Sequence, residues 1–217
     1  MTTTALDAAT IGSERSRRPL LAPLAGLALV GGLITLLVSP GGDDTGETPR
    51  EVVAYAASHE GWTMATAFFA LAAIPLGGIF VAALLTRLRG LATETEATLV
   101  LIGGIVFALC FALAFTIWSA PLVDVSGDAG RALAQAEAYL TVDDIGWFLL
   151  GAAGVGASLM AIPASLAASR STAVPSWLCW LGVALGVASL GTIAFLGIFA
   201  WMAWIAGASI VMLAGRR

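Results

Sequence analysis

The stretch SWLCWLGVALGVASLGTIAFLGIFAWMAWIAGASIVMLA, Ser176–Ala214, decides the fold of this chain. It holds 39 residues, and none of them is charged. One straight helix of this length would be about 58 Å long, at about 1.5 Å per residue, whereas the hydrocarbon core of a bilayer is about 30 Å thick. The stretch therefore predicts two membrane spans that reverse around Phe195-Leu196-Gly197, where the glycine gives the backbone the freedom of a tight turn.

The composition of the whole chain agrees with this interpretation. Hydrophobic residues make up 59% of the 217 residues and charged residues 11%, with a mean hydropathy of +0.95. Soluble domains have about 45–50% apolar and about 25% charged residues. We therefore expect an all-α, polytopic membrane protein, with a disordered cytoplasmic tail over residues 1–18 and a single six-span transmembrane domain over residues 19–217.

Four further apolar segments lie upstream of the C-terminal hairpin. Pro75, close to Gly77 and Gly78, is expected to kink the second span near the middle of the membrane. The four predicted spans are Leu20–Val38, Trp62–Thr86, Ala97–Trp118 and Ile145–Ala168.

Two short interfacial helices are expected in the two outer loops. Thr48-Pro49-Arg50-Glu51 has the pattern of a capping box and predicts a helix over 49–60 that Gly61 ends. A second helix is expected over Asp128–Leu140, after which Thr141–Asp144 would cap the next span. We expect the two helices to pack on each other and to bury Val52, Val53, Leu133 and Leu140, because burying each larger apolar side chain is worth about 1.5–3 kcal/mol.

The arginines predict the orientation of the spans. The chain has no lysine, and the six-span arrangement places eight of the ten arginines on one side. Because positive residues concentrate on the cytoplasmic side, both termini are expected in the cytoplasm. The eight arginines are Arg15, Arg17, Arg18, Arg87, Arg89, Arg170, Arg216 and Arg217, whereas Arg50 and Arg131 fall outside.

No familiar catalytic pattern is present in the sequence. Charged residues within the membrane are the usual mark of function in transporters and pumps, and no predicted span has one at its centre. The single histidine, His59, lies outside the predicted spans, so no serine–histidine pair or haem ligand set can be built within them. His-Glu-x-x-His, Cys-x-x-Cys and phosphate-loop motifs are also missing. We expect a non-enzymatic protein without a cofactor.

One candidate metal site can be named. His59 and Glu60 precede one predicted span, and Asp143 and Asp144 precede another at the same side. An imidazole and carboxylates at two neighbouring helix starts could bind a divalent cation. The alternative is that these charges face water and suit the helix dipole.

Small residues and tryptophans predict contacts of the spans. Gly182-x-x-x-Gly186 allows close helix approach, either in a homodimer or within the bundle itself. The tryptophans are expected in interfacial belts, including Trp201 and Trp204 at the outer interface.

Three segments carry a resemblance to a known group. Val52–His59, the Leu84–Arg89 exit from the second span, and Val174–Gly182 resemble uncharacterised actinobacterial integral membrane proteins, similar to the DUF4386-like six-span families of unknown function. Cys179 stands where glycine is expected in that group. The resemblance implies a six-span bundle in a bacterial plasma membrane and transfers no catalytic residues.

Two functions remain open at this stage, beside a third class, a lipid-modifying enzyme, which would need convergent polar groups at one interface and could use only the outer acidic cluster. The first is an accessory, sensing or scaffold protein of the membrane. The second is a small carrier or channel for an uncharged or lipid-like solute, which would open at the Pro75 kink. A polar-lined cavity that reaches the middle of the membrane would favour the carrier, and a dry core the accessory role. The bilayer, and a membrane protein or second copy, are the expected partners, with no nucleic acid.

Overall fold

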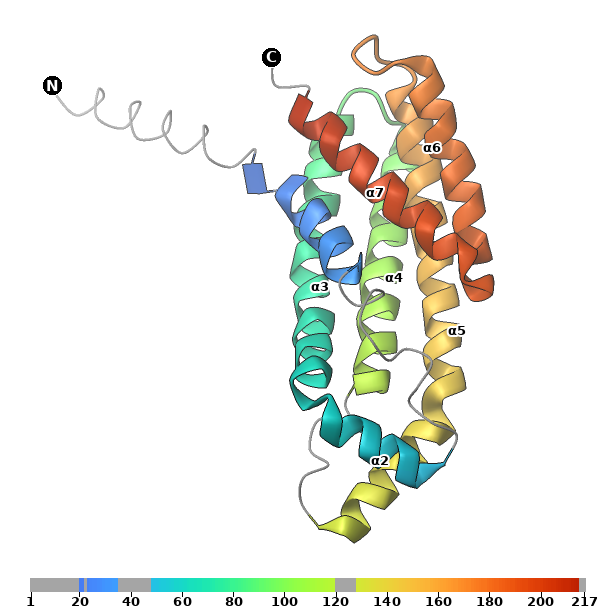
Figure 1. The fold of residues 1–217 in the computed structure, drawn as a ribbon. Helices are drawn as coiled ribbons and strands as arrows, with labels where there is room; N and C mark the ends of the chain where they lie inside the picture. Colours follow the sequence, from blue (N-terminus) through green and yellow to red (C-terminus); the bar gives the residue numbers. More distant parts are fainter. Residues whose placement is uncertain (1–19, 22, 35–47, 120–127, 215–217) are drawn as a thin grey trace, which may run out of the picture.

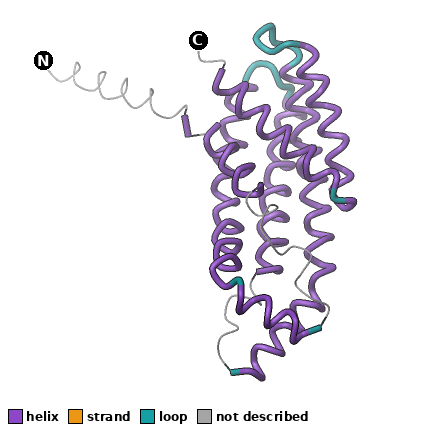
Figure 2. Tube along the Cα trace, viewed as in Figure 1, coloured by secondary structure: helices purple, strands orange, loops and turns teal. Residues whose placement is uncertain are grey.

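The structure, a computed structural model, describes residues 20–21, 23–34, 48–119 and 128–214. All regular structure in this part of the chain is helical (Figure 2). The apolar helix Pro23–Ile34 comes first. It is followed by α2 (Pro49–Ser58), α3 (Glu60–Leu88), α4 (Glu94–Ser119), α5 (Ala129–Ala168), α6 (Ser176–Ala188), the 3₁₀ helix η2 (Ser189–Ala194) and α7 (Leu196–Ala214), arranged as a bundle (Figure 1). The predicted tail over residues 1–18 lies outside the described residues.

Five helices in the described residues are long and apolar enough to cross a membrane. They are α3, α4, α5, the α6–η2 unit Ser176–Ala194, and α7. The chain therefore has the helices of a polytopic membrane protein. The predicted first span, Leu20–Val38, is described as a helix only over Pro23–Ile34, which is about 18 Å long at about 1.5 Å per residue. The sixth span thus stays a prediction.

The C-terminal apolar stretch forms two helices, as predicted. The α6–η2 unit ends at Ala194, α7 begins at Leu196, and Phe195 between them has φ 67° and ψ −41°. A Cβ atom on Gly197 would lie 2.2 Å from the backbone nitrogen of Thr192. Only glycine lets the start of α7 pack this closely on η2, so the reversal depends on that residue.

α5 corrects the prediction of two separate elements, Asp128–Leu140 and Ile145–Ala168. It is one helix of 40 residues, Ala129–Ala168, and therefore about 60 Å long. Thr141 does not cap a new helix, because its hydroxyl donates to the carbonyl of Glu137 at 2.8 Å within the same helix. No glycine or proline stands between Arg131 and Ile145 to interrupt the backbone hydrogen bonds.

The break between α2 and α3 also differs from the prediction. The capping box is confirmed, since the Thr48 N–H donates to Glu51 at 3.0 Å and the Glu51 N–H donates to the Thr48 hydroxyl. However, α2 ends at Ser58, with His59 as the residue between the two helices, and Gly61 lies inside α3. His59 has φ −126° and ψ 27°, and its ring Nδ1 lies 2.8 Å from the Ser58 hydroxyl. These local bonds stop the helix before the glycine is reached.

α2 packs across the first turns of α5, at the end of the bundle far from the α5–α6 loop (Figure 1). Val52, Ala56, Ala132 and Ala136 form a buried cluster that Val53 and Leu140 cover. The predicted contact between the two segments is thus confirmed, except that Leu133 is 37% exposed. α5 presents the Ala132–Ala136 side to α2, because residues four apart share one face of a helix.

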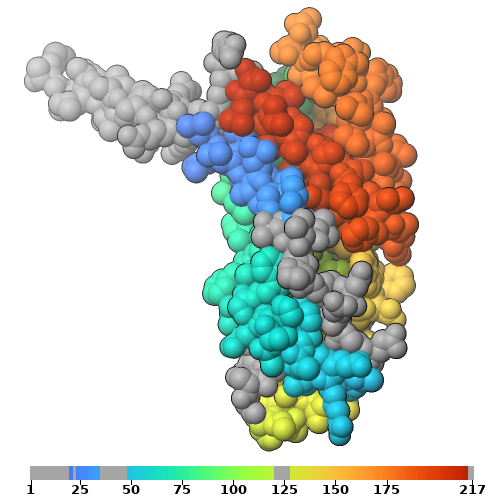
Figure 3. All heavy atoms as spheres, viewed as in Figure 1, coloured from blue at the N-terminus to red at the C-terminus, as the bar shows by residue number. Residues whose placement is uncertain are grey.

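The core of the bundle is aromatic and contains a tryptophan that was expected at the membrane surface. Trp201 is 1% exposed, and its ring lies 5.0 Å from that of Phe107 and 5.8 Å from that of Phe111. Trp204, 6% exposed, is also buried. The interfacial placement of these two residues was wrong. α7 runs obliquely across the bundle (Figures 1 and 3), and the side of the helix that carries Trp201 and Trp204 faces the bundle interior.

The most extensive helix contact joins α4 and α5. A Cβ on Gly103 would lie 2.6 Å from the backbone nitrogen of Met160, and one on Gly156 would lie 2.5 Å from that of Phe107. The two backbones therefore touch at a pair of glycines, which is the packing that small residues allow in membranes.

Candidate functional site

A cavity of about 570 Å³ lies at the end of the bundle that holds the α3–α4 and α5–α6 loops. Its walls are the last turns of α3, α5 and α7, the α5–α6 loop and the first turns of α6. Along α7 it extends from Ala203 to Ala214, which is about 16 Å of helix. Sites for small ligands have volumes of about 300–1,000 Å³, so this space can hold one.

The diverging course of α6 and α7 creates the cavity. The two helices meet at Phe195 and separate toward the α5–α6 loop (Figure 1). The wall is mainly aliphatic, with Leu178, Leu185 and Val211 among its residues. An apolar molecule that enters it would replace lipid contacts by protein contacts without exposing polar groups.

One hydrogen bond forms a fixed polar point on the wall. The indole N–H of Trp204 donates to the hydroxyl of Ser165 at 3.1 Å, and both side chains are buried. Gly182 lies directly against this pair, because a Cβ there would come 2.3 Å from the Ser165 hydroxyl and 3.2 Å from the indole nitrogen. The bond links α5 to α7 next to the start of α6.

Gly207 opens the wall on the α7 side. A Cβ on this glycine would meet no atom within 4 Å, although Gly207 lines the cavity. The empty space beside α7 is therefore not filled by a neighbouring helix. A larger side chain at this position would enter the cavity itself.

Arg87 supplies a positive charge at the mouth. It stands in the last turn of α3, and its Nη2 donates to the carbonyl of Met212 at 3.3 Å. No carboxylate of the described residues pairs with it. The lining residues include no other charged side chain among those that the structure describes.

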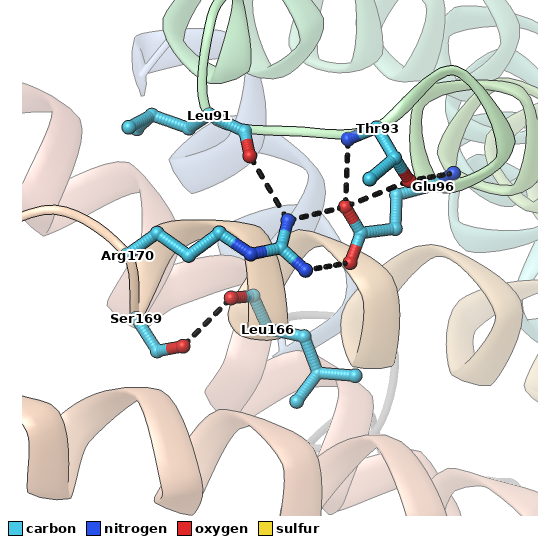
Figure 4. Close-up of polar contacts among 6 residues, drawn as sticks. All are labelled: Leu91, Thr93, Glu96, Leu166, Ser169 and Arg170. Carbon is cyan, nitrogen blue, oxygen red and sulfur yellow. Dashed lines mark hydrogen bonds and ion pairs between the residues drawn. The ribbon is translucent and has the colours of Figure 1, made fainter.

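A polar clamp holds the two loops beside the cavity together (Figure 4). Arg170 makes a two-pronged ion pair with Glu96, and its Nη1 also donates to the Leu91 carbonyl at 2.9 Å. Glu96 in turn accepts from the backbone N–H of Thr93 at 2.7 Å and so caps α4. The Glu96 carboxylate raises the pKa of Arg170 above its ordinary value. The clamp fixes the α5–α6 loop, which forms part of the cavity wall.

The aromatic core lies along α7 beyond Ala203, outside the residues that line the cavity. Trp201 lies on α7 beyond Ala203, in contact with Phe107 and Phe111 of α4. These side chains are almost fully buried and fill the centre of the bundle. On α7 the lining of the cavity therefore stops at Ala203, short of this core.

The residues of the predicted cation site are not gathered. His59 ends α2 and stacks on Tyr55 with ring centroids 4.4 Å apart, and Glu60 begins α3. Asp143 and Asp144 lie within α5 rather than at a helix start. No three histidine, cysteine, aspartate or glutamate side chains come together as a metal would need anywhere in the described ranges. Cation binding stays an untested prediction, and the separation of the four residues gives it no support.

The predicted small-residue face lies inside the chain's own bundle. A Cβ on Gly186 would lie 2.7 Å from Ile162 of α5, and Gly182 faces Ser165. Both glycines are buried. The Gly182–Gly186 face of α6 therefore packs on α5 within the chain, which is the packing alternative, and the homodimer through this face stays a prediction.

Sequence reasoning missed both the cavity and the clamp. Thr93-x-x-Glu96 repeats the Thr48-x-x-Glu51 pattern that was recognised at α2, so the cap of α4 had a visible signal. The pairing of Glu96 with Arg170, 74 residues away, had none. The cavity had none either, because it depends on the angle between α6 and α7.

Comparison with protein-family models, with curated proteins and with solved structures finds no match for this chain. The function must therefore be argued from the cavity and its walls.

Proposed function

We propose that the protein is a non-enzymatic membrane protein that binds one lipid-like molecule in the cavity between α5, α6 and α7, and that it serves as a sensing or accessory component. The observation that carries the proposal is the combination of volume and lining. A space of about 570 Å³ with aliphatic walls suits an apolar ligand, because the transfer of apolar surface out of water is favourable at about 25 cal/mol per Å².

The limited extent of the cavity, whose lining on α7 stops at Ala203, favours binding over passage. A carrier needs a route that continues to the opposite side, whereas Trp201, Phe107 and Phe111 fill the bundle beyond the cavity. Pro75 lies inside α3 and is not among the residues that line the cavity. We therefore rank the carrier second.

The proposed arrangement in the membrane has six spans, with the segment around Pro23–Ile34 as the first. Buried Leu29 and Leu33 support its place in the bundle. Arg87, Arg89 and Arg170 lie near the cavity end, which we place in the cytoplasm of a bacterial cell by the distribution of positive residues. α2 and the first turns of α5 then form a cap on the outer side.

The test is retention of lipid by the purified protein. Native mass spectrometry of the full chain, released from detergent, would measure the mass of any bound molecule. The wild type is expected to carry one lipid-like adduct. Gly207→Leu, which places a side chain into the open space of the cavity, is expected to lose it.

Gly78→Leu is the matched control. Gly78 also lies within a long helix, a Cβ there meets nothing within 4 Å, and the residue does not line the cavity. This variant should keep the adduct. Equal retention by Gly207→Leu and the wild type would show that bound lipid sits elsewhere and would refute the proposal.

A further inference from the structure

We infer that the ligand of this cavity is a single-chain amphiphile with a carboxylate head group, of the fatty-acid class, whose head group binds Arg87. The inference rests on the proposed function, because it names the chemistry of the molecule that the same cavity holds. Three features carry it, which are the position of Arg87, its lack of an acidic partner, and the shape of the apolar wall.

Arg87 is placed to receive a head group. It lines the cavity at the last turn of α3, at the end where the cavity opens. One of its guanidinium nitrogens donates to the Met212 carbonyl, which satisfies the end of α7 and orients the group. The guanidinium carries five N–H donors, so a second, anionic acceptor can bind without breaking this bond.

The charge balance favours a carboxylate. Arg87 is the only charged residue among the lining residues that the structure describes, and none of the described carboxylates pairs with it. A carboxylate brings one negative charge and matches the guanidinium with two parallel hydrogen bonds. A phosphate monoester carries a charge of about −1.5 to −2 near neutral pH, which one arginine would leave partly unbalanced.

The apolar wall continues from Arg87 into the bundle. Leu84, Leu88 and Met212 stand near the arginine, and Leu185 and Ala203 lie further from the α5–α6 loop along the wall. A single alkyl chain can follow this path with its charged end left at the open mouth. Because the lining runs from Arg87 toward Ala203 and stops short of the aromatic core, the chain would enter with the head group last.

The experiment compares two photoreactive probes on the full-length protein in phosphatidylcholine nanodiscs. One is palmitic acid with a diazirine in its chain, and the other is the matched alcohol, at a mildly alkaline pH at which the carboxyl group is ionised. Peptide mapping would measure labelling of α6 and α7. Hydrogen bonds to charged groups are worth about 1.5–3 kcal/mol, so the acid should label the cavity about tenfold to hundredfold more strongly than the alcohol.

Variants of the two neighbouring arginines sharpen the comparison. Arg87→Gln should reduce acid labelling to the level of the alcohol and leave alcohol labelling unchanged, whereas Arg87→Lys should keep part of the preference. Arg89→Gln is the matched control, since Arg89 does not line the cavity, and it should behave as the wild type. Loss of the helix-end bond to Met212 alone would not change the preference between acid and alcohol.

The outcomes separate this inference from the proposed function. Equal labelling by both probes in the wild type, abolished by Gly207→Leu, would retain a lipid-binding cavity and overturn the carboxylate. An acid preference that survives Arg87→Gln would also overturn it. Absence of cavity labelling by either probe would overturn both. The wild-type comparison decides the inference even if an Arg87 variant fails to fold.

Discussion

Two pairs of helices in this bundle use glycine in opposite ways. α4 and α5 touch through Gly103 and Gly156, where a Cβ would collide with the backbone of the partner helix. α6 and α7 diverge from Phe195, and Gly207 on α7 faces open space. In the first pair, the missing side chains allow the two backbones to touch. In the second pair, the missing side chain of Gly207 leaves a space unfilled. Glycine content alone therefore does not distinguish a packed interface from a binding cavity.

The largest expected effect is the loss of stability in Gly156→Ala. The added methyl would lie 2.5 Å from the backbone nitrogen of Phe107, and overpacking of this kind costs about 1–3 kcal/mol. Gly207→Ala is the matched variant and should be neutral or more stable by up to about 1 kcal/mol, because alanine favours the helix. Thermal unfolding in detergent would measure both. A similar change in melting temperature for Gly156→Ala and Gly207→Ala would contradict the claim that the first glycine is at a packed contact and the second faces open space.

The hydrogen bond between Trp204 and Ser165 should matter less than the glycine contact. Trp204→Phe keeps an aromatic ring near Phe80, whose centroid lies 6.2 Å from that of the indole, and removes only the N–H donor. We expect a loss of about 0.5–1.5 kcal/mol. A double-mutant cycle with Ser165→Ala tests the assignment, since the two changes should not add. Additive losses would mean that the bond contributes nothing of its own.

The strained junction of the hollow pair gives a third prediction. Phe195 has a positive φ of 67°, a conformation that costs about 1–2 kcal/mol for residues with a side chain. Phe195→Gly and Phe195→Ala both remove the ring, but only glycine relieves the backbone. The free energy of unfolding of the glycine variant should therefore exceed that of the alanine variant by about 1 kcal/mol. Thermal unfolding in detergent should show the glycine variant melting at the higher temperature. A higher melting temperature for Phe195→Ala than for Phe195→Gly would show that the backbone at this residue is not strained.

Removal of the ion pair between Arg170 and Glu96 should change the melting temperature least of the four predictions. Arg170 is half exposed and pairs with Glu96, and exposed ion pairs contribute little and are screened by salt. The difference in melting temperature between wild type and Arg170→Gln should thus shrink as salt is raised. Arg89→Gln, at an exposed arginine of the neighbouring loop, serves as the control and should show no such difference. A difference that persists at high salt would point to packing rather than charge.

Local patterns predicted the local parts of the structure. The break at Phe195 followed from the length of an uncharged stretch, and the start of α2 from Thr48 and Glu51. The continuity of α5 was missed because the Thr141–Asp144 segment resembles a helix start, while its residues also fit a helix interior. The break at His59 was missed because the prediction relied on Gly61, a residue type that commonly ends helices.

The amino-acid sequence by itself determined the membrane-protein class and the long apolar helices, since both depend on composition and on the length of uninterrupted apolar runs. Only the tertiary structure decided that Trp201 is buried, that Gly182 contacts Ser165, and that Arg87 stands at the mouth of a cavity. These facts depend on how α3 to α7 are placed and rotated against one another. In an apolar chain every face of a helix can be buried or can meet lipid, so hydrophobicity does not encode which side turns inward.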